Sequence, residues 1–149
     1  MSFPTFMDTP AQWPGPAPKE ADVVVIGGGV IGVCTALFLA RAGQRVVLLE
    51  KGRIAAEQSS RNWGWIRVQG RDPDGLDSKM LSSAETAKLI PNLSRRYAGA
   101  IYTAQDMRAE PWVAVPALAG IAVREGATLV ENCAVRGLDI EGGAVAGVI

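Results

Sequence analysis

The chain has 149 residues, of which 48% are hydrophobic and 20% charged, and its 15 basic residues balance 15 acidic ones. This composition is typical of one globular domain, and the zero net charge gives no reason to expect nucleic acid or an anionic membrane as a partner. The absence of histidine excludes Ser–His and Cys–His nucleophilic catalysis and the commonest zinc sites. We expect no metal site, and reduced, buried thiols at Cys34 and Cys133.

Prolines are frequent in the first 20 residues, which disfavours a helix and predicts an extended arm. Phe3, Phe6 and Trp13 could pack this arm onto the domain or onto a neighbouring subunit, and a disordered tail is the alternative. The arm lacks the apolar core and basic start of a signal peptide, and the longest apolar helical run is too short to span a bilayer. We therefore expect a cytoplasmic protein without a membrane segment.

A short β-branched run at residues 23–26 predicts a buried parallel strand, and Gly27, Gly29 and Gly32 follow it in G-x-G-x-x-G spacing. In this motif the first glycine permits a tight turn, the second leaves room for a pyrophosphate, and the third lets the helix pack closely on the strand. The helix at residues 30–42 is apolar nearly all round, which predicts that it is buried against a sheet.

A second predicted strand, residues 46–49, ends in Glu50. This acid lies close to the ~20 positions after Gly32 at which an acid meets a ribose hydroxyl in dinucleotide-binding proteins. A carboxylate there repels a 2′-phosphate, so the ligand should carry an unphosphorylated adenosine ribose. The strand, helix, strand and terminal acid together predict dinucleotide binding rather than a mere packing role for the glycines.

Residues 51–65 distinguish a flavin from a nicotinamide ligand. A simple NAD domain would continue with another amphipathic helix and strand, whereas this stretch mixes Ser, Arg, Asn, Gly and Trp. The hydroxyl and guanidinium groups of residues 59–61 suit a phosphate, and Gly64 lets the backbone approach a flat ring. The alternative is a surface helix capped by one of the serines, with Trp63 and Trp65 in the core.

The second half of the chain has mixed α/β character. Ser82 and Glu85 form a capping box that predicts a short helix ending before Pro91. A further helix followed by a strand can extend the parallel sheet by a right-handed crossover. The predicted elements are a strand at 98–103, a helix at 112–125, a strand at 128–131, and an antiparallel hairpin of 134–140 with 144–149.

Three stretches carry a family resemblance: PKEADVVVIGGGVIG, VVLLEKGRIAAEQSSRNWGW and RAEPWVAVPALAGIAVREGATLVENCAVRGLDIEGG. Together they resemble the FAD-dependent amino-acid oxidases of the D-amino-acid-oxidase-like superfamily, especially the bacterial L-amino-acid oxidases and deaminases, including reconstructed sequences of that type. The resemblance runs from residue 18 to residue 149 with one interruption. It implies an α/β fold: a Rossmann-like FAD-binding βαβ core with an antiparallel β-meander, and a substrate domain that is largely missing.

The resemblance also implies contacts between FAD and particular residues. These are Gly27, Gly29, Val30, Ile31 and Gly32 at the pyrophosphate, Glu50 at the ribose, Lys51 and the backbone of Val135 at the adenine, Gln58, Ser59, Ser60 and Arg61 along the phosphates and ribityl chain, and Asn62, Trp63, Gly64 and Trp65 near the isoalloxazine. Val135 is expected on a strand.

The implied reaction is oxidative deamination of an amino acid, with L-amino acids the expected substrates. A hydride leaves the α-carbon for the flavin, and the imine hydrolyses to a 2-oxo acid and ammonia, with hydrogen peroxide or a reduced acceptor as the second product. Arg61 and Arg67 are the nearest arginines for a substrate carboxylate, but Arg61 suits phosphate and Arg67 suits solvent, so no catalytic residue is assigned. The alternatives are a non-catalytic dinucleotide-binding module and an NAD-dependent enzyme.

The expected organisation is an arm (1–20), an FAD-binding segment (21–75), a border segment of the substrate domain (76–110) and a return to the FAD-binding domain (111–149). Family members have a long helical segment after the position of Pro73, so a piece is expected to be missing near residues 74–77. The chain also stops at Ile149 within an apolar strand, which predicts an open sheet edge. We therefore expect a fragment that is inactive alone and associates with a second copy or a complementary polypeptide.

Overall fold

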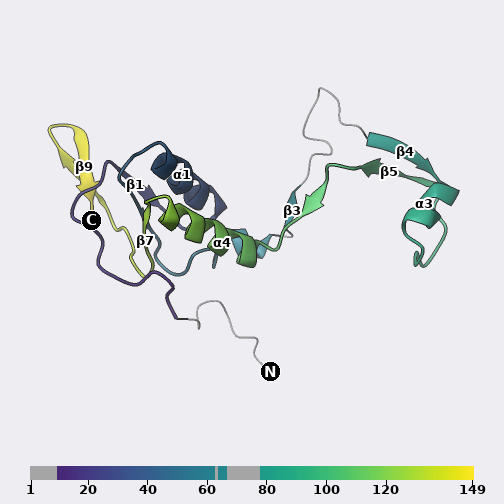
Figure 1. The fold of residues 1–149 in the computed structure, drawn as a ribbon, viewed down its shortest axis with the longest axis horizontal. Coiled ribbons are helices and arrows are strands. Elements are labelled where there is room, and N and C mark those ends of the chain that lie inside the picture. The colour runs from purple at the N-terminus through teal and green to yellow at the C-terminus, as the bar shows by residue number, and fades with distance from the viewer. Residues whose placement is uncertain (1–9, 63, 67–77) are drawn as a thin grey trace. The chain divides into compact units, whose positions relative to one another are not determined.

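The computed structural model describes residues 10–62, 64–66 and 78–149. They belong to two compact units, one comprising Met1–Trp63 with Glu110–Ile149 and the other Gly64–Ala109. The second unit is therefore inserted into the first along the chain, as the colours of Figure 1 show. Within the described ranges, every helix is too short or too polar to cross a membrane.

A parallel sheet with the strand order β1-β2-β7 forms the centre of the first unit. β1 (Val23–Ile26) and β2 (Val46–Leu49) have the predicted bounds, and β7 (Thr128–Val130) is one residue shorter than predicted. All residues of the central strand β2 are buried, as expected for a parallel strand covered on both faces. The predicted βαβ unit and its extension by a third parallel strand are therefore confirmed.

An ion pair joins the starts of β1 and β2. Arg45 donates its guanidinium to Asp22 at 2.7 Å and its backbone N–H to the same carboxylate at 2.8 Å. The side-chain hydrogen bond, followed by the backbone one, lowers the pKa of Asp22 below its ordinary value. The pair is exposed, so we expect it to align the two strands without adding much stability.

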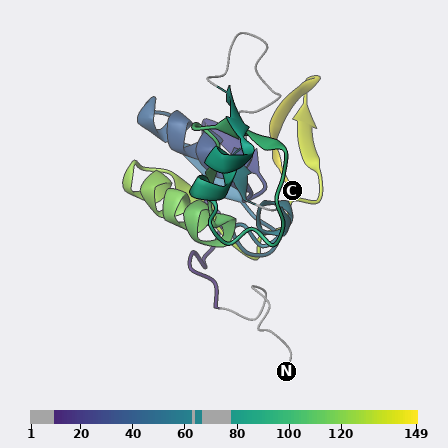
Figure 2. The same ribbon diagram turned by 90° about the vertical axis from the view of Figure 1, so that its right-hand side faces the viewer.

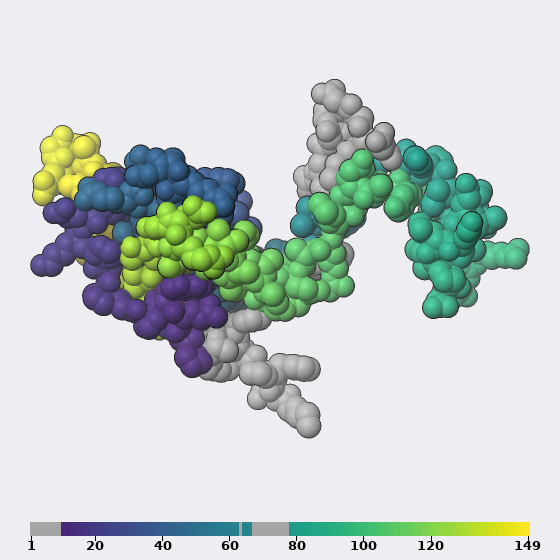
Figure 3. Space-filling model, in the orientation of Figure 1, coloured from purple at the N-terminus to yellow at the C-terminus, as the bar shows by residue number. Residues whose placement is uncertain are grey.

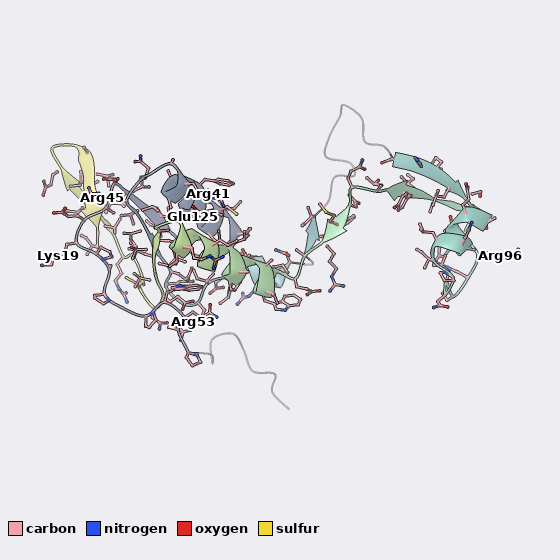
Figure 4. The ribbon with its side chains drawn as sticks, viewed as in Figure 1. Lys19, Arg41, Arg45, Arg53, Arg96 and Glu125 are labelled. Atoms are coloured by element: carbon pink, nitrogen blue, oxygen red, sulfur yellow. The ribbon has the colours of Figure 1, made fainter. Side chains whose placement is uncertain are left out.

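Helices α1 (Val30–Arg41) and α4 (Pro111–Arg124) lie side by side against the sheet (Figures 1 and 2). Small side chains let the two helices approach closely, and Arg41 pairs with Glu125 at 3.2 Å near their C-terminal ends (Figure 4). The buried residues that the helices contribute to the core are Val33, Ala36, Leu37, Ala40, Val115, Ala119 and Ala122.

The prediction that α1 is buried against the sheet is confirmed, but only for one of its faces. Ile31 and Phe38 are 78% and 64% exposed, respectively. They lie about two turns apart on one face of the helix, whereas the opposite face packs on the sheet and α4. Figure 3 shows α1 in blue at the surface of this unit.

The C-terminal hairpin consists of β8 (Leu138–Glu141) and β9 (Ala144–Val148), which pair antiparallel as predicted. The prediction that the first strand begins at residue 134 is wrong, so neither Val135 nor Cys133 lies on a strand. Asn132 has a left-handed backbone (φ 56°), and the Cys133 N–H donates to the carbonyl of Glu50 at 2.8 Å. The chain therefore turns at the end of β7 before the hairpin begins.

The described part of the N-terminal arm packs on the rest of the first unit through Trp13, which is partly buried against the hydrophobic core. This agrees with one of the two alternatives that the sequence left open. Phe3 and Phe6 lie outside the described residues. Both cysteines are free and partly buried.

In the second unit, β4 (Ser78–Ser82) pairs antiparallel with β5 (Gly99–Thr103), and α3 (Ser83–Leu89) begins at the predicted capping box. A second pair, β3 (Trp65–Ile66) with β6 (Met107–Arg108), joins the two ends of the unit. There the Ala109 N–H donates to the carbonyl of Gly64 at 2.8 Å. The connection expected between residues 73 and 77 lies outside the described residues.

Candidate functional site

A pocket of about 220 Å³ lies where β1 and β2 end and α1 begins. In a parallel α/β sheet, this is the edge at which ligands bind. Of the predicted site residues, the pocket is lined by Gly27, Gly29, Glu50, Gln58 and Ser59, and its other lining residues are Gly28, Arg53, Ala55, Ala56 and Glu57.

The glycine loop has the geometry that the motif requires. Gly27 has a φ of 105°, which side-chain-bearing residues rarely adopt. A Cβ on Gly32 would lie 2.0 Å from the carbonyl oxygen of Gly27, so only glycine lets the helix pack there. Within the described part of the chain, the N–H groups of Ile31 and Gly32 donate to no other group. They remain available for an anion at the N-terminus of α1.

Glu50 is only 6% exposed and holds the pocket together. Its Oε2 accepts a hydrogen bond from the Gly28 N–H at 2.6 Å, and its Oε1 accepts one from the Gly52 N–H at 2.7 Å. A carboxylate can accept about four hydrogen bonds, so two positions remain for the hydroxyls of a ribose. Ribose binding stays a prediction, and the structure adds a second role, which is to fix the glycine loop to the end of β2.

The short helix α2 (Gln58–Arg61) contacts the start of α1 through a serine. Ser59 is buried, and its Oγ accepts a hydrogen bond from the Val30 N–H at 2.8 Å. It acts as the cap that Gly29, which has no side chain, cannot supply at the N-cap position. The Oγ of Ser60 is buried with no hydrogen-bond partner in the described structure.

The charged residues beside α2 form exposed ion pairs. Glu57 forms ion pairs with Lys51 at 3.5 Å and with Arg61 at 3.4 Å. Because all three side chains are largely exposed, these pairs leave Lys51 and Arg61 able to turn toward a phosphate or an adenine ring. The amide of Asn62 donates to the carbonyl of Ser59 at 3.1 Å.

The donor set at this pocket fits a dinucleotide. It combines free N–H groups at a helix N-terminus with a buried carboxylate that has remaining acceptor capacity. Next in sequence to the lining residue Ser59, Ser60 adds an orphaned hydroxyl, although it does not itself line the pocket. In a dinucleotide, the phosphate oxygens would accept from the N–H groups and the ribose hydroxyls would donate to the carboxylate. The Ser60 hydroxyl could bond to a further polar atom of the ligand.

Ser60→Ala is expected to leave the free energy of unfolding of the ligand-free protein unchanged or to raise it slightly. The buried hydroxyl makes no hydrogen bond there, so its removal ends a desolvation cost. The same substitution should weaken dinucleotide binding by ~1 kcal/mol, because the ligand loses the hydroxyl as a partner. Urea unfolding with and without ligand measures both effects.

Ser59→Ala is the matched control and should behave in the opposite way in the ligand-free protein. It removes the acceptor of the Val30 N–H and should cost about 1 kcal/mol of stability. If Ser60→Ala lowers ligand-free stability as much as Ser59→Ala does, the Ser60 hydroxyl has a structural partner and is not held for a ligand.

The predicted residues Val30, Ile31, Gly32, Lys51, Ser60, Arg61 and Asn62 lie near lining residues in sequence without lining the pocket themselves, and Val135, Gly64 and Trp65 are not brought to it by the described structure. Val135 lines a separate cavity of about 650 Å³ beside Val24, Val47 and the C-terminal hairpin. Gly64 and Trp65 belong to the second unit. Trp63 lies outside the described residues. No described group of three or more Cys, Asp or Glu side chains could hold a metal ion.

Sequence reasoning missed Ile54, Ala55 and Glu131, whose hydrogen bonds fix the backbone that lines the pocket. The Ala55 N–H donates to the carbonyl of Gly28 at 2.9 Å, and the Ile54 N–H donates to Oε1 of Glu131 at 2.8 Å. Glu131 follows β7 as Glu50 follows β2, and both are buried. An acid at the end of each of two buried strands was the signal in the sequence that could have identified Glu131.

Comparison with protein families gives one match, to the model described as "DAO: FAD dependent oxidoreductase", over residues 22–76 and 69–149. Mouse mitochondrial sarcosine dehydrogenase is 29% identical over 182 residues, covering 84% of this chain and 20% of that protein. The structure of L-amino acid deaminase from Proteus myxofaciens has a TM-score of 0.87 and 23% identity, covering 95% of this chain and 44% of that one. Glycine oxidase from Bacillus cereus has a TM-score of 0.79 and 26% identity, covering 87% and 51%.

These comparisons bear on the piece expected to be missing. The chain spans about half the length of the solved structures and a fifth of the mouse protein. The alignment with the mouse protein is longer than this whole chain, so that protein carries residues without a counterpart here. The two family matches overlap at residues 69–76. An omission near residues 74–77 stays a prediction.

Proposed function

Because the chain belongs to the DAO family of FAD-dependent oxidoreductases, and its cofactor is therefore FAD, we propose that it is the cofactor-binding part of an enzyme that oxidatively deaminates amino acids, with L-amino acids the expected substrates. The products are a 2-oxo acid, ammonia, and hydrogen peroxide or a reduced acceptor. Family membership favours this over an NAD-dependent enzyme.

The observation that supports this substrate class is the similarity to sarcosine dehydrogenase over 84% of the chain. Glycine oxidase, similar over 87% of the chain, is named for another amino acid. Glycine and sarcosine both carry an amine on the carbon that would be oxidised. A non-catalytic dinucleotide-binding module has no comparable support.

FAD, when bound, supplies the acceptor for the hydride that leaves the α-carbon. The residues of this chain would hold the cofactor in place. The N–H groups of Ile31 and Gly32 would bind the pyrophosphate, Glu50 the ribose hydroxyls, and Ser60 a phosphate or ribityl oxygen. No described residue is assigned to the substrate, because the pocket over the flavin is proposed to need a substrate domain, and the chain spans about half the length of the solved structures.

The purified chain is expected to bind FAD and to show the absorption bands of a bound flavin. With FAD bound, it should reduce no dye and form no hydrogen peroxide with a panel of L- and D-amino acids, because shielding the ring and orienting the substrate are proposed to need the substrate domain. A protein that carries this sequence together with a complete substrate domain should reduce the dye with amino acids.

Glycerol 3-phosphate, which offers a hydroxyl in place of the amine, is the control substrate. Turnover of glycerol 3-phosphate but of no amino acid would overturn the proposed substrate class and leave FAD binding intact. A chain that binds NAD but not FAD would overturn the cofactor assignment at this site.

A further inference from the structure

Glu131 is a buried acid that connects three segments of the first unit. It is 5% exposed and directly follows β7. Its Oε2 accepts hydrogen bonds from the backbone N–H groups of Gln12 at 2.7 Å and Trp13 at 3.3 Å. Its Oε1 accepts one from the Ile54 N–H at 2.8 Å, and its own N–H donates to the carbonyl of Trp13 at 3.0 Å. A buried carboxylate is tolerated when hydrogen-bonded in this way, and two of its three donors come from the N-terminal arm.

The segment that Glu131 holds forms a wall of the dinucleotide pocket. Ile54 is buried against the glycine loop so closely that a Cβ on Gly28 would lie 2.5 Å from its Cδ1. Ala55, a lining residue of the pocket, has a φ of 65°, an unfavourable conformation for alanine. Its N–H donates to the carbonyl of Gly28 at 2.9 Å. The position of the 54–55 backbone therefore determines where the glycine loop lies.

We propose that Glu131 is a positioning residue for the dinucleotide site and that docking of the N-terminal arm on it is coupled to FAD binding. The physical path runs from the arm through the Glu131 carboxylate to Ile54 and Ala55, and from them to Gly28. The arm fixes the position of the Glu131 carboxylate, and this carboxylate holds the strained turn at residues 54–55. That turn fixes the position of the glycine loop, which would bind the pyrophosphate. This inference rests on the proposed cofactor site. It assigns a role in FAD binding to the N-terminal arm and Glu131, which do not line that site. Coupling of this kind is reciprocal, so bound FAD must tighten the docked arm.

The test uses Glu131→Gln and Gln12→Pro in the full chain. In Glu131→Gln, one carboxylate oxygen becomes an NH2 group, which cannot accept a hydrogen bond. At least one of the backbone N–H groups that now donate to Glu131 therefore loses its acceptor. Proline at position 12 removes the strongest arm donor, whereas Gln12→Ala keeps the backbone N–H and is its matched control. Glu125→Gln, an exposed acid on the same unit, is the control for the change of charge.

FAD affinity is measured by quenching of flavin fluorescence at a temperature at which every variant is folded. We expect Kd to rise about tenfold for Glu131→Gln and for Gln12→Pro, and to stay within about twofold for the two controls. The double variant should be little weaker than either single one, since both break the same path. Amide hydrogen exchange at residues 12 and 13 should slow when FAD binds to the wild type and not in Glu131→Gln.

The possible outcomes separate this inference from the proposed function. A wild-type chain that does not bind FAD would refute the cofactor site itself. A wild type that binds FAD, with Glu131→Gln and Gln12→Pro binding equally well, would refute the coupling. Lower melting temperatures with unchanged Kd and unchanged exchange would also refute it, because Glu131 would then serve the fold alone.

Discussion

Gly32→Ala is expected to abolish stoichiometric FAD binding and to destabilise the protein by about 1–3 kcal/mol, the usual cost of overpacking. The added Cβ would lie 2.0 Å from the carbonyl oxygen of Gly27 and 3.4 Å from Cγ1 of Val25. The closer neighbour is a backbone atom, so it cannot rotate out of the way as a side chain could. Either α1 or the loop must shift, and both displace the N–H groups intended for the pyrophosphate. The flavin-to-protein absorbance ratio after desalting, together with urea unfolding, measures the two effects.

Gly120→Ala in α4 is the matched control. The nearest heavy atom to a Cβ there is Nη1 of Arg124 at 3.8 Å, the end of a flexible side chain. Alanine inside a helix is favoured over glycine by about 0.5–1 kcal/mol, so this variant should be more stable and bind FAD normally. If Gly32→Ala retains one FAD per chain, the assignment of the glycine loop to the pyrophosphate is wrong.

Glu50→Ala is expected to weaken FAD binding by ~1–3 kcal/mol and to lower the stability of the ligand-free protein by a similar amount. The two effects have separate causes. The ribose hydroxyls lose a charged acceptor, and the N–H groups of Gly28 and Gly52 lose the carboxylate that they donate to at 2.6 and 2.7 Å. Titration with FAD and urea unfolding of the ligand-free protein measure them independently.

Glu125→Ala removes an acid of the same size from the surface and should change neither quantity by more than ~0.5 kcal/mol. A Glu50→Ala protein that is destabilised but binds FAD with unchanged affinity would mean that Glu50 only braces the glycine loop. The adenosine ribose would then have another acceptor.

The local pattern predicted the βαβ unit well because its determinants lie close together in sequence. β-branched runs, the glycine spacing and an acid at a strand end suffice to place β1, α1 and β2, and their bounds agree within a residue. The pairing of β7 with β2 was also predictable, since a helix followed by a buried strand leaves few alternatives.

The failures concern contacts between distant parts of the chain. The apolar sequence of α1 predicted packing on the sheet but could not show that Ile31 and Phe38 are exposed, because exposure depends on which elements cover each face of the helix. A strand was expected to begin at residue 134. Instead the backbone turns at Asn132, which has a left-handed conformation, and the strand begins only at Leu138. The role of Glu131 requires knowing that the arm and the 54–55 turn meet at one carboxylate, and no local pattern shows this.

The two ends of the second unit are paired with each other. This pairing affects how well the cofactor-binding unit tolerates a change in the length of the second unit. The hydrogen bond from Ala109 to Gly64 and the pairing of β3 with β6 hold the entry and exit of that segment together. Loop-closure entropy grows only as the logarithm of loop length, at about 0.6 kcal/mol per doubling. Because β3 and β6 pair at its two ends, the second unit can gain or lose many residues between them. The entropic cost to the parallel sheet of the first unit stays small. We therefore expect changes of length beyond the β3–β6 pair to disturb the parallel sheet less than changes within the cofactor-binding unit.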